Sequence, residues 1–176
     1  MKITINPLDT ESINKAYQEI INYHKKLKEK ETTFLKRLGE IGVNVASIEF
    51  DTTIQLANAE IHARLEPVRV NKEVTGNRLV ITATGKDVIF IEFGAGINYG
   101  NGYPTTQASG SSGRPNGIVG IGEYGAGQGK NPKGWWYTGT DGKGHHSYGN
   151  QPAMAMYEAE KQIIEQITHI AREVFK

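Results

Sequence analysis

The longest regular pattern of apolar positions lies in the first third of the chain. These residues recur every three or four positions, so they share one side of a helix whose other sides carry lysines. They are Ile13, Tyr17, Ile20, Ile21, His24, Leu27, Phe34, Leu38, Ile41, Val45 and Ile48. Because glycine lowers helix propensity, Gly39 and Gly42 predict that this long helix is bent or broken between Glu29 and Gly42.

The residues in front of this helix suggest a strand and a turn. Lys2 to Asn6 alternate between polar and apolar side chains, which predicts a short edge strand. Pro7 and the pair Asp9-Thr10 have the chemistry of a turn followed by a helix cap.

Further along the chain the spacing of the apolar residues changes from a helical repeat to every second residue. Val68, Val70 and Val74 precede Gly76-Asn77, and Leu79, Ile81 and Ala83 follow it. This pattern predicts a β-hairpin with a two-residue turn, one face of which must be covered by a helix.

In the last segment the apolar residues again have a helical spacing. This predicted helix is a candidate to cover one face of the hairpin. Its apolar positions are Met156, Ala159, Ile163, Ile167, Ile170 and Val174. Pro152 is predicted in the first turn, where its missing N–H costs nothing. The predicted fold class is α+β: an antiparallel sheet with a β-hairpin, packed by a long N-terminal helix and a C-terminal helix.

A long glycine-rich and aromatic loop separates the hairpin from the last helix. Residues 94–150 hold seventeen of the twenty-one glycines and show no sustained pattern apart from GWWYTG. They also hold the aromatics Tyr99, Tyr103, Tyr124, Trp135, Trp136, Tyr137 and Tyr148. Aromatic side chains bury large areas at little entropic cost, so this loop is predicted to contact another surface.

Length, cysteine content and charge limit which classes of protein this chain can belong to. A length of 176 residues predicts one domain, residues 1–176, with 94–150 as its extended loop. The absence of cysteine excludes disulfides and thiolate chemistry and fits a cytosolic environment. A net charge of +1 gives no global attraction to nucleic acid or membrane. The segment MKITINPLDTES lacks an apolar leader, so we expect a soluble protein that is not exported.

Motifs for cofactors and metals fail their context tests, so we predict neither a cofactor nor a metal. The stretch from Gly120 to Gly125 fits G-x-G-x-x-G, but the residues after it cannot begin a helix. Gly129-Lys130 resembles the end of a P-loop, yet Asn131 stands where Ser or Thr must reach magnesium. Asp141 with His145-His146 is interpreted as a polar loop tip, because adjacent histidines rarely ligate one ion.

Glu92 is the one carboxylate in the apolar stretch VIFIEF, and it has two interpretations. Flanked by Ile91 and Phe93, it could act as an acid or base in a hydrolase together with Asp141 or His145. Alternatively it accepts backbone N–H or cationic hydrogen bonds where the core meets the loop. The structural role is favoured because no nucleophile or partner base is identifiable nearby, so we predict no enzyme.

Trp135 and Trp136 suggest a second alternative function. With Arg114, Lys130, Lys133 and Lys143 nearby, they could stack on the bases of a single-stranded nucleic acid. Those cations are spread along the chain, and a protein interface explains the aromatic residues equally well.

The order of these pieces resembles the tail-component family of long-tailed phages and prophages. A helical half and a hairpin are followed by FIEFGAG, by YGAGQGKNPKGWWYTG and by GNQPAMAMYEAEKQI. The resemblance covers about Val68 to Lys176. The positions that carry it are Glu92, Phe93, Gly94, Gly96, Trp136, Gly149, Pro152 and Met154. Ala95 replaces the usual threonine, and Ala153 and Ala155 stand where larger or basic residues are common.

This resemblance implies a virion structural protein of the head–tail neck or tail terminus. It would form a homo-oligomeric ring, expected to be hexameric, and contact neighbouring neck or tail-tube proteins after assembly in the host bacterial cytoplasm. DNA would be met only as it passes through the ring, and no membrane is involved. The expected interface residues are Glu92, Phe93, Gly94, Gly96, Tyr99, Tyr124, Trp135, Trp136, Tyr137 and Pro152.

Overall fold

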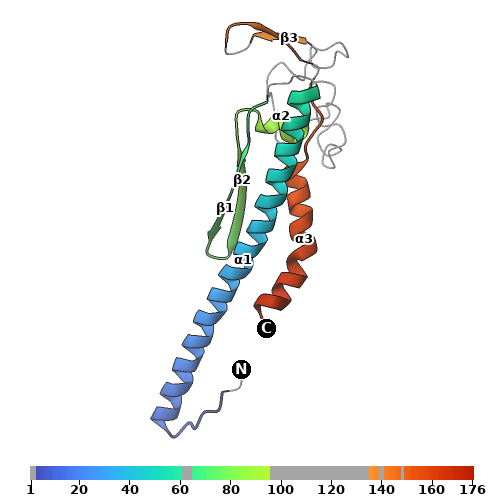
Figure 1. Cartoon of the computed structure of the whole chain (residues 1–176). Helices are drawn as coiled ribbons and strands as arrows, with labels where there is room; N and C mark the ends of the chain where they lie inside the picture. Colours follow the sequence, from blue (N-terminus) through green and yellow to red (C-terminus); the bar gives the residue numbers. More distant parts are fainter. Residues whose placement is uncertain (1–2, 61–64, 96–134, 139–140, 148) are drawn as a thin grey trace, which may run out of the picture.

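The computed structural model describes residues 3–60, 65–95, 135–138, 141–147 and 149–176. The elements are α1 (Thr10–Glu60), β1 (Arg69–Thr75), β2 (Arg78–Thr84), α2 (Val88–Phe93), β3 (Trp135–Thr138), β4 (Gly144–Ser147) and α3 (Ala155–Val174). Figure 1 shows α1 as the long axis of the molecule, with the β1–β2 hairpin along one side and α3 along another. The predicted α+β fold class is confirmed.

Helix α1 runs unbroken for 51 residues, about 77 Å at 1.5 Å per residue. Of the bend or break predicted between Glu29 and Gly42, the break is therefore wrong. A Cβ added at Gly42 would lie 2.3 Å from Ile81 Cδ1 and 2.7 Å from Ile163 Cδ1. The glycine lets the hairpin and α3 approach the same point of α1, so close packing and not helix termination explains its presence.

Gly42 and Gly39 should respond differently to replacement by alanine. A Cβ at Gly39 would meet Leu79 and the flexible Lys72 side chain at 2.8 and 2.9 Å, and these can move outward. Gly39→Ala should therefore be nearly neutral, because the strain is offset by a helix-propensity gain of up to about 1 kcal/mol. Gly42→Ala should cost about 1–3 kcal/mol through overpacking. Urea unfolding of both variants tests this, and a stabilised Gly42→Ala would contradict it.

The predicted edge strand at the N-terminus is not formed in residues 3–6. Instead, local hydrogen bonds close a turn onto α1: the Asn6 backbone N–H donates to Ser12 Oγ at 2.9 Å, and Leu8 N–H donates to Asn6 Oδ1 at 3.1 Å. Asp9 Oδ1 accepts from Glu11 N–H at 3.0 Å, so the predicted cap chemistry is confirmed. These polar groups form a turn at the helix start and no ladder with a neighbouring strand.

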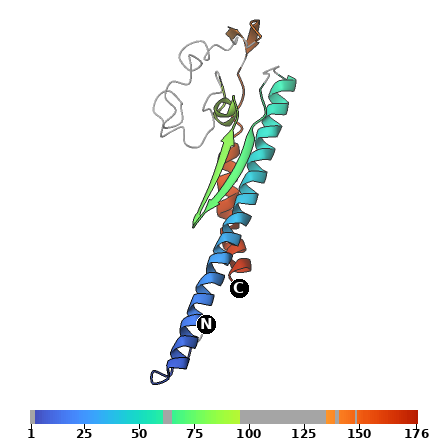
Figure 2. The same cartoon turned by 90° about the vertical axis from the view of Figure 1, so that its left-hand side faces the viewer.

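The predicted β1–β2 hairpin is confirmed with its two-residue turn. Thr75 pairs with Arg78, and Gly76 has a φ of 60°, which suits glycine in a tight turn. Figure 2 views the molecule from the side of this hairpin, with both strands running along the upper half of α1. Helix α1 supplies most of the cover, and Ile163 of α3 meets Ile81 over Gly42.

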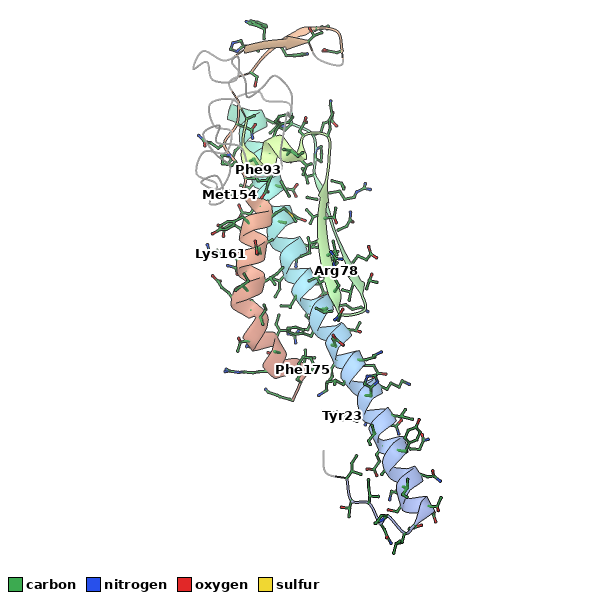
Figure 3. All side chains as sticks on the ribbon, turned by 180° about the vertical axis from the view of Figure 1, so that it is seen from behind. Tyr23, Arg78, Phe93, Met154, Lys161 and Phe175 are labelled. Carbon is green, nitrogen blue, oxygen red and sulfur yellow. The ribbon has the colours of Figure 1, made fainter. Side chains whose placement is uncertain are left out.

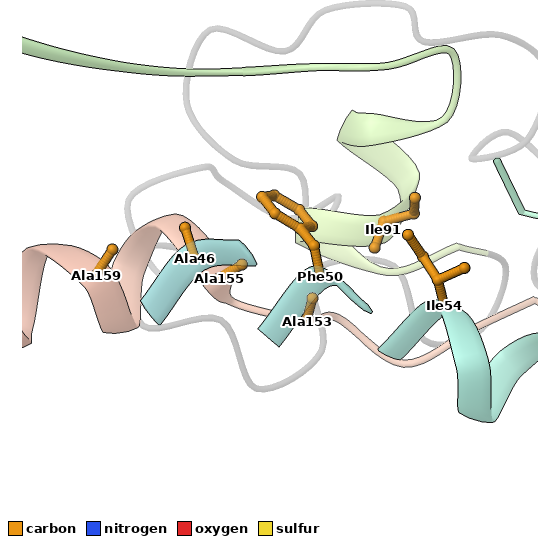
Figure 4. Packing of buried hydrophobic residues seen from close by; sticks show 7 residues of the cluster. All are labelled: Ala46, Phe50, Ile54, Ile91, Ala153, Ala155 and Ala159. Carbon is orange, nitrogen blue, oxygen red and sulfur yellow. The ribbon is translucent and has the colours of Figure 1, made fainter. Parts of the chain in front are cut away.

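The core lies where α1, α2 and the start of α3 meet (Figure 4). Its buried members are Ala46, Phe50, Ile54, Ile91, Ala153, Ala155 and Ala159. Phe50 and Ile91 are the largest fully buried side chains in the described residues. Ile48, predicted on the buried stripe, is 63% exposed. The buried side of α1 instead follows every fourth residue from Leu38 through Gly42 and Ala46. Because Gly42 and Ala46 are small, the pattern of large apolar residues does not mark this side.

The N-terminal part of α1 extends beyond the rest of the fold (Figure 1). The end of α3 contacts α1 through the Arg37–Glu173 ion pair at 2.6 Å and the Phe34–Phe175 ring pair at 5.8 Å. Residues before Lys28 lie past this contact and past the turn of the hairpin, beside which Lys28 lies together with Gly76 and Asn77, and Figure 3 shows Tyr23 on that projecting part. We call Thr10–Lys30 the projecting segment.

Candidate functional site

The Glu92 carboxylate lies at the start of helix α3. Its residue is 5% exposed, and Oε1 and Oε2 accept from the Met156 backbone N–H at 3.2 and 3.1 Å. Met156 belongs to the first turn of α3, where N–H groups have no partner within the helix and the helix dipole favours a negative charge. The predicted role of Glu92 as an acceptor of backbone N–H is confirmed, and the element that it caps is α3.

The backbone of α2 makes the complementary contacts. Ala153 N–H donates to Ile91 O at 2.7 Å, and Met154 N–H donates to Glu92 O at 3.2 Å. Both carbonyls belong to the last turn of α2 and have no partner within that short helix. The end of α2 and the residues that lead into α3 therefore provide hydrogen-bond partners for each other's backbone groups. Figure 3 shows Phe93 and Met154 where the two helices meet. We call residues 90–95 and 149–156 the joint.

Asn150 closes the other side of the joint. It is 4% exposed, and its Nδ2 donates to Phe90 O at 2.9 Å and to Gln151 O at 3.0 Å. Ala95 N–H donates to Asn150 O at 2.9 Å within an antiparallel bridge. Ala95 and Asn150, the two ends of the segment between α2 and α3, are thus held beside each other by this hydrogen bond. Sequence reasoning missed Asn150, although it stands in the GNQPAM stretch.

Backbone conformations at the joint explain several of its residue types. Gly94 and Gly149 have φ of 81° and 85°, in the region that favours glycine. Met154 has φ 53° and ψ 28° at the N-cap of α3, a left-handed conformation that costs a non-glycine residue about 1 kcal/mol or more. The surrounding hydrogen bonds hold it there.

Other predicted interface residues need correction or lie elsewhere. Phe93 is half-buried at the end of α2, whereas the residue of α2 in the core is Ile91, which is fully buried. Pro152 precedes α3 and is not in its first turn, because Ala153 and Met154 are engaged with α2 before the helix begins. Gly96, Tyr99 and Tyr124 lie outside the described residues.

Part of the predicted loop forms a second hairpin. Strands β3 and β4 pair antiparallel, with Trp135 opposite Ser147, Trp136 opposite His146 and Tyr137 opposite His145. Trp136 is 71% exposed, and its ring contacts the His146 ring edge-on with centroids 5.0 Å apart. For Trp135 and Tyr137 only the backbone is described. The exposed indole of Trp136 is available to a binding partner.

Asp141 and His145 are paired with each other within this hairpin. His145 Nε2 lies 2.8 Å from Asp141 Oδ1. This hydrogen bond, helped by the Lys143 backbone N–H, lowers the pKa of Asp141 below its usual 3.8. Within the described parts of the chain, no group of three or more His, Asp or Glu side chains is placed to hold a metal ion. The alternative of a hydrolase using Glu92 with these residues is not tested by this geometry.

Comparison with known proteins returned no relative: no family model, no curated protein and no solved structure matches the chain. In the described residues, no helix combines the length and apolar character needed to span a membrane.

Proposed function

We propose that the protein is a virion structural component of the head–tail neck or tail terminus of a long-tailed phage or prophage. It assembles into a ring of six copies, and the segment between Ala95 and Asn150 reaches the neighbouring copy or the adjoining ring. The Glu92 carboxylate has an architectural role in this proposal, and the protein carries out no reaction.

The observation that carries the proposal is the convergence of six of the eight resemblance positions on one joint. Glu92, Phe93 and Gly94 end α2, while Gly149, Pro152 and Met154 lead into α3. They lie far apart in the sequence but share the hydrogen-bonded base of the joint. Residues that recur in a family for structural reasons are expected to form such a unit, so the geometry supports treating the motif as a whole.

The joint also suits an assembly role physically. A subunit of a ring needs a rigid body and a segment that can conform to another surface. Buried Glu92 and Asn150 hold the two ends of the segment 96–149 together. The composition of this segment, rich in glycine and aromatic residues, suits contact with another surface. Glycine loses more conformational entropy than any other residue when its backbone is fixed, so a glycine-rich contact makes association depend on a well-matched partner.

Replacing Trp136 tests this function. Because the Trp136 side chain is largely exposed, Trp136→Ala should leave the melting temperature and helix content unchanged while weakening the ring roughly tenfold or more. Trp136→Phe keeps an aromatic surface and should retain most of the assembly. Sedimentation velocity over a concentration series measures both.

The proposal is refuted if Trp136→Ala leaves assembly untouched but removes binding to single-stranded nucleic acid. That binding would fall steeply with salt concentration.

A further inference from the structure

The projecting segment carries an apolar stripe that the described part of the chain leaves largely exposed, apart from the small Ala16, which is buried. Six of its large apolar side chains are 40–60% exposed: Ile13, Tyr17, Ile20, Ile21, Tyr23 and Leu27. The part of α1 that carries the stripe projects past the end of α3 and past the β1–β2 hairpin, with Tyr23 labelled on it (Figures 1 and 3). A helix with such a stripe generally packs it against another helix.

The arrangement of the stripe is nearly symmetric about Ile20. Ile13 and Leu27 lie seven residues to either side of Ile20, and Tyr17 and Tyr23 lie three residues to either side. Running a second copy of the helix in the opposite direction therefore places Ile13 against Leu27 and Tyr17 against Tyr23. The same side chains face one another in both halves of such a contact, as a two-fold interface requires.

Charge along the projecting segment is separated in the same way. From Asp9 to Glu19 the chain has three carboxylates and one lysine, whereas from His24 to Lys30 it has four lysines and one glutamate. Apart from the partly buried Lys30, these charged residues are exposed. An antiparallel copy sets the acidic half of each helix beside the basic half of the other, while a parallel copy sets like charges together.

We propose that the projecting segment is a self-association surface, on which a second copy of this chain docks antiparallel with its contact centred near Ile20. The two-fold contact is distinct from the head-to-tail contacts of a ring, so it does not depend on the proposed function. In a ring-forming protein it would join two rings face to face. Its short length, about 30 Å of helix, makes the association weak and concentration-dependent.

Single cysteines test the geometry directly because the natural chain contains none. Disulfides form only when Cα atoms approach within about 7 Å. An antiparallel contact centred at residue 20 separates the two copies of residue 13 by about 21 Å along the axis. Mild oxidation should therefore cross-link Ile20→Cys to itself, and a mixture of Ile13→Cys with Leu27→Cys to a heterodimer, but not Ile13→Cys to itself. Cross-linking of Ile13→Cys alone, or no cross-link in any sample, overturns the proposal.

Charge reversal gives a second test that leaves the stripe intact. Glu11/Glu19→Lys and Lys25/Lys28→Glu should each reduce self-association at least about tenfold at low salt, since the two halves that lie beside each other then carry net charge of the same sign. Mixing the two variants in equal amounts should restore it as a heterodimer. All four positions are exposed, so circular dichroism should show unchanged folding. Unaltered self-association of either variant alone would refute the charge matching on which the proposal rests.

Discussion

Phe50→Ala is expected to lower the free energy of unfolding by about 3–5 kcal/mol. The Phe50 side chain is fully buried where α1, α2 and the start of α3 meet. Its neighbours Ala46, Ala153 and Ala155 are too small to fill the space left by the ring (Figure 4). The variant therefore loses both the transfer free energy of the ring and the contacts around a cavity. Chemical denaturation monitored by circular dichroism measures the loss.

The matched control is Ile48→Ala, two residues away on the same helix. Ile48 is largely exposed, so its truncation should change stability by less than about 1 kcal/mol. Equal effects of the two variants would show that the core does not lie on the Phe50 side of α1.

Glu92→Gln is expected to cost about 1.5–3 kcal/mol, the usual worth of a hydrogen bond to a buried charged group. Both carboxylate oxygens accept from Met156 N–H, and the negative charge faces the positive end of the α3 dipole. Glutamine offers one oxygen without charge, and its amide donors oppose the N–H groups of the first turn. The same denaturation experiment, supported by hydrogen exchange at the start of α3, detects the change.

A surface glutamate on the helix that Glu92 caps provides the comparison for this variant. Glu165→Gln removes an exposed carboxylate of α3 and should be nearly neutral. If Glu92→Gln instead folds with wild-type stability and loses a catalytic activity, the architectural interpretation of Glu92 fails.

Local patterns were enough to predict most elements of the fold. The apolar period of 3.6 identified both long helices, and the alternation around Gly76-Asn77 identified the first hairpin with its turn. These signals are visible in the sequence because each arises from side chains within one element. The cap at Asp9 was predictable for the same reason.

The errors arose where distant residues decide the structure. Gly42 was interpreted as a helix breaker because the sequence does not reveal that Ile81 and Ile163 converge on it. Ile48 was assigned to the core, whereas the ridge through Ala46 and Phe50 is too rich in small residues to stand out.

At the joint, sequence reasoning found the key carboxylate but not its partners. Glu92 was conspicuous as a charge among apolar residues, yet its acceptor role for α3 joins residues 64 positions apart. Asn150 has no local signal, since its amide holds the joint by donating to the carbonyl of Phe90, 60 positions away, in addition to that of its neighbour Gln151. The β3–β4 hairpin was missed because glycines and histidines obscure any alternation.

Native mass spectrometry of the purified chain tests the proposed ring most directly. It should be recorded over a range of concentrations for the wild-type protein and for Ile20→Asp, which removes the self-association surface of α1. A closed oligomer of six copies in both samples, with paired rings only in the wild type, is the predicted result. A protein that stays monomeric at every concentration, or that grows as an open ladder of oligomers, would contradict the ring.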